Sequence, residues 1–62
     1  MLKVKAIRVN LGLSQEEFAK ELDMPLATYQ RKEQGKSPWL YREILTISEI
    51  SGVDIGDISN EP

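Results

Sequence analysis

Two residue types that stabilise or functionalise many small folds are missing from this 62-residue chain. It has no cysteine, so no disulfide bond can stabilise the fold. It has no histidine either, and without Cys or His we expect no structural zinc site. We also expect no other metal and no cofactor. The chain also lacks a glycine-rich phosphate loop and a pair of carboxylates placed for acid–base chemistry, so we expect no enzymatic activity.

Long hydrophobic runs are missing too. The longest uncharged stretch has seven residues, whereas a membrane-spanning helix needs about 20. The opening residues, MLKVKAIRV, are too short and too charged for a secretory signal. From these features we expect a cytoplasmic protein with no membrane partner, and a bacterial or phage origin is consistent with them.

An excess of positive charge is missing as well. The net charge is −2, whereas the footprint of a nucleic-acid-binding protein is usually basic. Residues 1–36 carry seven Lys or Arg and five Asp or Glu, a net +2, and residues 37–62 carry one Arg and five acids, a net −4. This asymmetry fits a basic face formed by the first part of the chain.

What the chain does contain is the pattern of one small helical domain over residues 1–62. A chain of this length buries only about 60% of the surface that its unfolded form exposes, so the core is small. Apolar residues recur at helical spacing, and the predicted fold class is all-α, a compact five-helix domain with no strand. The helices are expected at about residues 2–10, 15–22, 25–34, 38–51 and 54–58. Residues 59–62 are expected to form a frayed tail.

Proline, glycine and capping residues set the expected helix boundaries. Pro25 suits the opening of the third helix, and Gly35 suits its C-terminal cap. Ser37 is the expected N-cap of the fourth helix, with Pro38 as its first residue. The fourth helix should therefore begin directly after the turn that follows the third.

The apolar faces of these helices also predict the core. Tyr41 is expected to pack in the core, whereas Trp39 either covers its edge or lies exposed near a partner. The other core residues are expected to be Val4, Ile7, Leu11, Phe18, Ala19, Leu22, Tyr29, Ile44, Ile47 and Ile55.

The stretch LSQEEFAKEL marks the start of the second helix in two ways. Ser14 and Glu17 have the spacing of a capping box, and Leu13 and Phe18 have that of a hydrophobic staple. A three-residue turn then leads to the third helix, which gives residues 14–33 the layout of a helix-turn-helix motif. Two helices that cross closely need a small residue at the crossing, and Ala19 is expected there.

At these residues the sequence resembles a known family. The stretches IRVNLGLSQEEFAKELDM, TYQRKEQGKS and SGVDIGDI are similar to the lambda-repressor-like domain of the Cro/CI and XRE transcriptional regulators, over about residues 4–58. The resemblance implies a sequence-specific regulator that binds double-stranded DNA. It also implies a homodimer that sets two recognition helices about 34 Å apart and represses by occupying a promoter.

The resemblance also implies which side chains approach base edges. These are Leu26, Ala27, Thr28 and Arg31, and the alternative for Leu26 is packing against Leu22. Arg31 can donate two hydrogen bonds to a guanine, and the methyl groups of Ala27 and Thr28 can contact a thymine methyl. The alternative for Arg31 is a phosphate contact that carries no sequence information.

Other residues are expected to position the motif on DNA. Contacts to the DNA backbone are expected from Gln15, Lys36 and Ser37, supported by the helix dipole at the start of the fourth helix. The resemblance further implies a structural ion pair between Arg8 and Glu33, for which a two-bond fork would pin the third helix.

The sequence departs from the family pattern at several positions. Asp23 stands where glycine is usual, and Ser51 stands where leucine is common, which removes apolar volume from a small core. Lys32 replaces a usual hydrophobe, so its stem is expected to cover apolar surface while its ammonium reaches solvent or phosphate.

A second functional hypothesis stands beside the DNA-binding regulator. The same fold can serve as a protein-interaction module, such as an antitoxin or a partner in a mobile-element switch. The acidic second half of the chain and the apolar start of the third helix, Pro25 to Ala27, favour this alternative.

Overall fold

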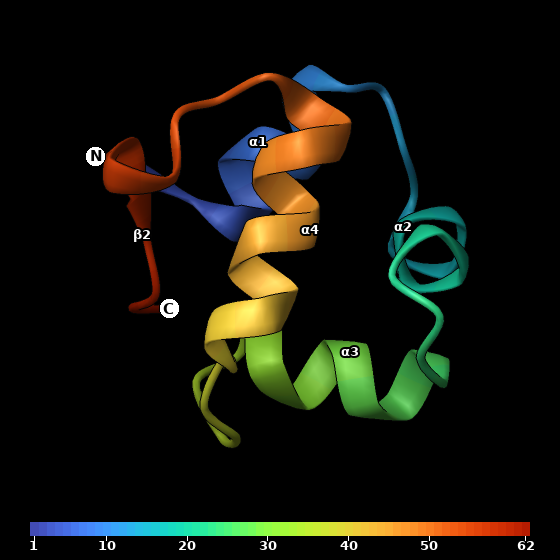
Figure 1. The fold of residues 1–62 in the computed structure, drawn as a ribbon. Helices are drawn as coiled ribbons and strands as arrows, with labels where there is room; N and C mark the ends of the chain where they lie inside the picture. The colour runs from blue at the N-terminus through green and yellow to red at the C-terminus, as the bar shows by residue number, and fades with distance from the viewer.

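The computed structural model describes all residues from 1 to 62. The elements, in chain order, are β1 (Leu2–Lys3), α1 (Val4–Asn10), α2 (Gln15–Glu21), α3 (Leu26–Glu33), α4 (Tyr41–Ser51), the 3-10 helix η1 (Ile55–Asp57) and β2 (Ile58–Ser59). Figure 1 shows α4 running in front of α1, with α2 to one side and α3 across the lower end of α4. The fold is therefore mostly helical, with four α-helices and a single 3-10 turn.

The prediction of five helices and no strand was wrong at both ends of the chain. Leu2 pairs with Ile58, and Lys3 pairs with Ser59, in a parallel two-stranded sheet. Residues 2–3 therefore lie outside the first helix, and Ser59 is paired, although a frayed tail was expected there. A two-residue strand has no periodicity of its own, and its partner comes from the opposite end of the chain, so the helical pattern could not reveal it.

The expected fifth helix is only a 3-10 turn. Asp54 caps this turn, and its carboxylate accepts a hydrogen bond from the Gly56 amide at 2.9 Å. Ile58, the last residue of the predicted helix, is buried in β2. The turn is followed directly by a strand because Ile58 pairs with β1.

Two helices begin later than predicted. Pro25 is the N-cap of α3 and not its first residue, and α4 begins at Tyr41 with Leu40 as N-cap, so Ser37 and Pro38 lie outside it. The Glu43 carboxylate accepts from the Leu40 amide at 2.8 Å and thereby caps α4.

Most of the predicted core is confirmed. The buried apolar residues are Val4, Ile7, Phe18, Ala19, Tyr29, Trp39, Ile44, Ile47 and Ile58, and Leu22 and Ile55 are partly buried against them. The predictions for Leu11 and Tyr41 were wrong, because their exposed fractions are 36% and 73%.

Both errors have a structural reason. Trp39 fills the core position next to α4, and since α4 begins only at Tyr41, the Tyr41 side chain lies on the outside. Leu11 lines an open hollow of about 220 Å³ at the end of α1, and this hollow also includes Ser51. A serine at position 51 is too small to cover Leu11, so the end of α1 stays exposed.

Candidate nucleic-acid interface

Residues 14–33 form the helix-turn-helix motif that positions α3. Its capping box is present: the Ser14 amide donates to Glu17 Oε1 at 2.9 Å, and the Glu17 amide donates to Ser14 Oγ at 3.0 Å. These hydrogen bonds lower the pKa of Glu17, which keeps a negative charge at the N-terminus of α2. Asp23 has a left-handed φ of 55°, so the chain reverses sharply between α2 and α3.

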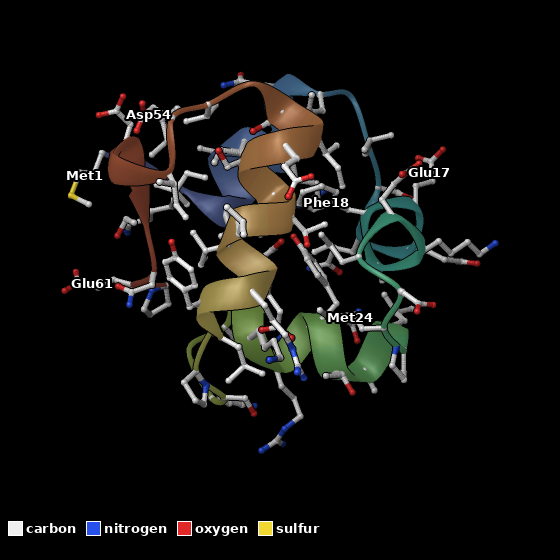
Figure 2. All side chains as sticks on the ribbon, viewed as in Figure 1. Met1, Glu17, Phe18, Met24, Asp54 and Glu61 are labelled. Carbon is white, nitrogen blue, oxygen red and sulfur yellow. The ribbon has the colours of Figure 1, made fainter.

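The inner side of the motif is packed with aromatic rings. Phe18 points into the core while its neighbour Glu17 points to solvent (Figure 2). The Phe18 and Tyr29 rings meet edge to face with centroids 5.8 Å apart, and Tyr29 meets Trp39 in the same way, also at 5.8 Å. These contacts join α2, α3 and the segment before α4, so they fix which side of α3 faces solvent.

Glu33, the last residue of α3, anchors the helix to the rest of the fold. Its Oε2 accepts from Arg8 Nε at 3.1 Å and from the Tyr29 hydroxyl, and its Oε1 accepts from Gln15 Nε2 at 3.0 Å. Burial acts to raise the pKa of Glu33, but these three donors outweigh it and hold the pKa below its ordinary value. Burial and the same carboxylate raise the pKa of Tyr29, so its hydroxyl remains a donor.

Arg8 and Glu33 form their ion pair through one hydrogen bond, whereas a two-bond fork was expected. Glu33 Oε1 is occupied by Gln15, and Arg8 Nη1 donates at 2.9 Å to the Leu13 carbonyl oxygen. The guanidinium is therefore shared between α3 and the segment that leads into α2. One arginine on α1 thus holds both helices of the motif.

Lys32 is buried, with only 8% of the residue exposed, so its stem covers apolar surface as expected. The expectation that its ammonium reaches solvent or phosphate was wrong. Lys32 Nζ donates to Glu43 Oε1 at 2.6 Å and to the Pro38 carbonyl oxygen at 3.2 Å, and it lies 5.8 Å from the centre of the Trp39 ring. The ion pair with Glu43 ties α3 to the first turn of α4.

The exposed side of α3 is the surface that remains for a ligand. Its exposed residues are Leu26, Ala27, Arg31 and Gln34, and Thr28 and Gln30 are half-buried beside them. Arg31 makes no ion pair, whereas Lys32 and Glu33 are both paired inside the fold. The outer face of α3 therefore carries one free cation and no free acid, although the net charge of the chain is −2.

The three residues expected at the DNA backbone lie in different surroundings. Lys36 is exposed and Ser37 is half-buried, and their amides donate to the Arg31 carbonyl oxygen at 2.8 and 3.3 Å. Gln15 is half-buried, and its side-chain oxygen accepts from Gln30 Nε2 at 3.1 Å. Because α4 begins only at residue 41, its helix dipole does not support residues 36 and 37 as expected.

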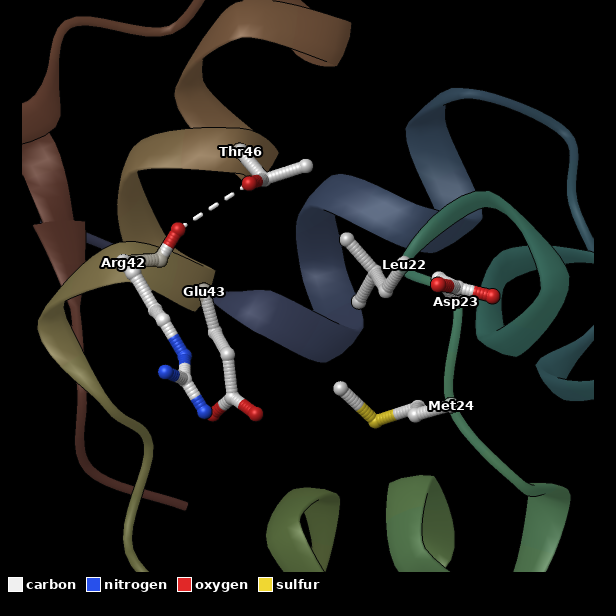
Figure 3. A pocket seen from close by; sticks show the side chains of 6 residues that line it. All are labelled: Leu22, Asp23, Met24, Arg42, Glu43 and Thr46. Atoms are coloured by element: carbon white, nitrogen blue, oxygen red, sulfur yellow. Dashed lines mark hydrogen bonds between the residues drawn. The ribbon is translucent and has the colours of Figure 1, made fainter.

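A hollow of about 320 Å³ lies between the turn of the motif and the start of α4 (Figure 3). It is lined by Leu22, Asp23, Met24, Arg42, Glu43 and Thr46. Thr46 Oγ1 donates to the Arg42 carbonyl oxygen at 3.0 Å, and Glu43 is already paired with Lys32. No group of three acidic side chains lies close enough together in the structure to hold a metal ion. The hollow is thus a gap where the turn of the motif packs beside the start of α4.

Gln30 and Gln34 belong to this surface but were left out of the sequence-based assignment of the site, and of the two only Gln30 makes a side-chain hydrogen bond. Its position three residues after Ala27 places it beside the outer face of α3, and that spacing was the available signal. Its hydrogen bond to Gln15 joins two helices, so it became visible only in the folded structure.

A capped α2, a sharp turn and an α3 whose outer face carries a free cation define a DNA-binding helix-turn-helix domain. A family model described as helix-turn-helix matches residues 4–58. The chain belongs to this family, of the Cro/CI and XRE type. It matches no curated protein and no solved structure. None of its helices combines the length and the apolar character that crossing a membrane requires.

Proposed function

We propose that this protein is a sequence-specific regulator of prokaryotic or phage origin that represses transcription by occupying operator DNA in the cytoplasm. The observation that carries the proposal is the charge on the outer face of α3. Arg31 is exposed there without an acidic partner. Glu33, the only acid of α3, is withdrawn into contacts with Arg8, Tyr29 and Gln15. A helix without a free acid can approach the phosphates that line a DNA groove without repulsion.

Four side chains of α3 would contact bases. Arg31 would donate two hydrogen bonds to guanine O6 and N7, the commonest specific contact in the major groove. The methyl groups of Ala27 and Thr28 would contact a thymine methyl, and Leu26, which is exposed at the first turn of α3, would add apolar contact.

Three further residues would contact the DNA backbone and set the register of α3. Lys36 is an exposed cation directly after α3, so it would neutralise a phosphate. Ser37 would donate its hydroxyl. Gln15 has one amide hydrogen in use toward Glu33, which leaves its second amide hydrogen for a phosphate oxygen.

A homodimer would supply the specificity that one helix lacks. The eight residues of α3 span about 12 Å, so one copy contacts only a short segment of the major groove. Two copies would place their α3 helices in successive major grooves about 34 Å apart. Sedimentation of the protein with and without its DNA site measures this stoichiometry directly.

A protein-interaction module remains the second candidate. The observation that favours it is the apolar surface that α4 leaves open, where Tyr41 and Leu45 are both exposed. In this case the protein, acting as an antitoxin or a mobile-element switch partner, would bind another protein through its helices, and DNA binding would be weak.

The test is selection of binding sites from random DNA, followed by titrations with two variants. Arg31→Ala should lose affinity for the selected site by about 1–3 kcal/mol and lose preference at one base pair of each half-site. Lys36→Ala, the matched control that removes a cation next to α3, should weaken specific and random DNA equally and reduce the salt slope by about one unit.

Two results would contradict the proposal at different levels. Equal losses on all sequences for Arg31→Ala would make Arg31 a phosphate contact. If the wild-type protein selects no DNA at about 50 mM salt, where electrostatic binding is strong, the protein-interaction module becomes the preferred function.

A further inference from the structure

Two glutamine side chains and one carboxylate form a relay that crosses from α3 to α2 and back. Gln15 Nε2 donates to Glu33 Oε1 at 3.0 Å, and Gln30 Nε2 donates to Gln15 Oε1 at 3.1 Å. Glu33 is ionised, so it can only accept hydrogen bonds. Gln15 must therefore turn its NH₂ group toward Glu33 and its oxygen toward Gln30. Gln30 must then donate to that oxygen from its own NH₂ group. The carboxylate thus fixes the orientation of both amides.

The relay leaves one edge of Gln30 free. A glutamine amide has two donor hydrogens and an acceptor oxygen, and the relay uses only one hydrogen of Gln30. The second N–H and Oε1 have no partner within the protein. No buried side-chain nitrogen or oxygen in the structure lacks a hydrogen-bond partner, so the unpartnered Oε1 is open to solvent. Gln30 therefore presents a donor and an acceptor side by side.

Gln30 lies beside the exposed residues of the outer face of α3. Residues 27, 30, 31 and 34 follow helical spacing on one side of α3, and Ala27, Arg31 and Gln34 are exposed. Ala27, one turn before Gln30, has a side chain too short to cover it. A glutamine amide matches adenine in the major groove, because its oxygen accepts from N6 and its N–H donates to N7.

We propose that Gln30 is a specificity-determining residue that contacts an adenine in the major groove, and that Gln15 and Glu33 position its amide. This inference rests on the proposed DNA-binding function and extends it to a residue outside the four expected base contacts. A free glutamine side chain loses rotamer freedom when it binds, whereas the relay has already ordered Gln30. The amide is also held in the one orientation that leaves an acceptor and a donor for the base.

The experiment starts from sites that the wild-type protein selects from random DNA, and then measures affinity for the selected site and for versions with the adenine replaced. Gln30→Ala should lose on the order of 10- to 100-fold discrimination at that base pair and keep the preference that depends on Arg31. Gln30→Glu removes the donors and with them the hydrogen bond to Gln15 Oε1. The preference for adenine should therefore be lost, and any remaining preference should move toward cytosine, whose N4 group donates. Gln34→Ala is the matched control, because Gln34, the C-cap of α3, is exposed and makes no side-chain hydrogen bond.

Gln15→Ala tests the positioning role. It should reduce discrimination at the same adenine and at no other base pair. Because Gln15 is also proposed to contact a phosphate, an equal loss of affinity on every sequence is expected beside this effect, and only the change in discrimination reports the positioning role. Urea unfolding of each variant, followed by the fluorescence of Trp39, identifies any variant that is simply unfolded.

The outcomes separate this inference from the proposed function. If the wild-type protein selects no site, both fail. If it selects a site and Gln30→Ala keeps the full base preference, or loses affinity equally on every sequence, only the role of Gln30 is overturned. A selected site without a conserved adenine would overturn it as well.

Discussion

The contacts of Glu33 make Glu33→Gln the sharpest test of how the fold holds α3. The substitution keeps the size of the side chain and removes its charge. In the wild-type protein, Oε2 accepts from both Arg8 and Tyr29, and Oε1 accepts from Gln15. The substitution replaces one of these two oxygens with an NH₂ group, which cannot accept. An amide oxygen on one side cannot serve all three donors, so at least one donor loses its acceptor.

The expected cost follows from the burial of the pair. Removing one partner of a fully buried ion pair costs about 3–5 kcal/mol. The side chains of Glu33 and Arg8 are 6% and 12% exposed, so Arg8 keeps some hydration, and we expect a loss of about 2–4 kcal/mol. A domain of this size has a free energy of unfolding of only about 3–9 kcal/mol, so the variant should be close to unfolded at 37 °C.

The loss should depend on pH in a defined direction. The pKa of Glu33 is lower in the folded protein than the value of about 4.3 for an unfolded glutamate. Its contribution to stability is therefore fully present above about pH 4.3 and is lost as the pH falls through the lower, folded value. The difference in unfolding free energy between wild type and Glu33→Gln should be constant from pH 5 to 7 and shrink in more acidic solution.

Urea unfolding followed by the fluorescence of the single, buried Trp39 measures this difference at each pH. Tyr29→Phe is the matched control: it removes one donor to Glu33, keeps the ion pair, and should cost only about 1 kcal/mol. A double-mutant cycle of Arg8→Ala with Glu33→Ala should show a coupling of at least about 0.5 kcal/mol. A loss below about 0.5 kcal/mol for Glu33→Gln, or one that stays constant down to pH 3, would refute the reasoning.

Three further predictions concern the remaining contacts. Ala19→Leu should overpack the buried face of α2 and lower the free energy of unfolding by about 1–3 kcal/mol, so an unchanged thermal midpoint would show that the helices do not cross there. Lys32→Met should lower the free energy of unfolding by about 2–3 kcal/mol, because it leaves the Glu43 carboxylate without its cation. Adding Glu43→Gln should recover part of this loss, and strictly additive losses in urea unfolding would contradict the coupling. Glu16→Gln should tighten binding to all DNA sequences by about 2- to 5-fold, because Glu16 lines a hollow together with Leu26 at the start of α3, where its negative charge would repel phosphates. Unchanged affinity in a titration would place Glu16 away from the phosphates.

The local signals of the sequence predicted the motif well. The capping box of Ser14 and Glu17, the small Ala19 and the three-residue turn all act within a few residues of one another. Such signals depend on backbone geometry that forms wherever the sequence occurs, so they place α2 and α3 in the chain without any knowledge of the rest of the fold. The apolar spacing of Ile44 and Ile47 in the same way predicted the buried side of α4.

The start of α4 and the core position of Trp39 depended on contacts between elements. Pro38 is a good first residue for a helix, and local signals favoured it. In the folded chain, its carbonyl oxygen accepts from Lys32, and Trp39 packs against Tyr29, so the segment stays outside the helix up to Leu40. Local preference was overridden because these two contacts come from another helix.

The sequence by itself determined that the chain forms capped helices with a helix-turn-helix motif, because caps, turns and apolar spacing are properties of neighbouring residues. Only the tertiary structure decided what each polar side chain does. The ammonium of Lys32 reaches Glu43, and the amide of Gln30 reaches Gln15, although both lie on the same helix as the exposed Arg31. Hydrogen bonds are short and directional, so their partners are set by how helices distant in sequence are packed together. Which face of α3 remains free for DNA is therefore a result of packing.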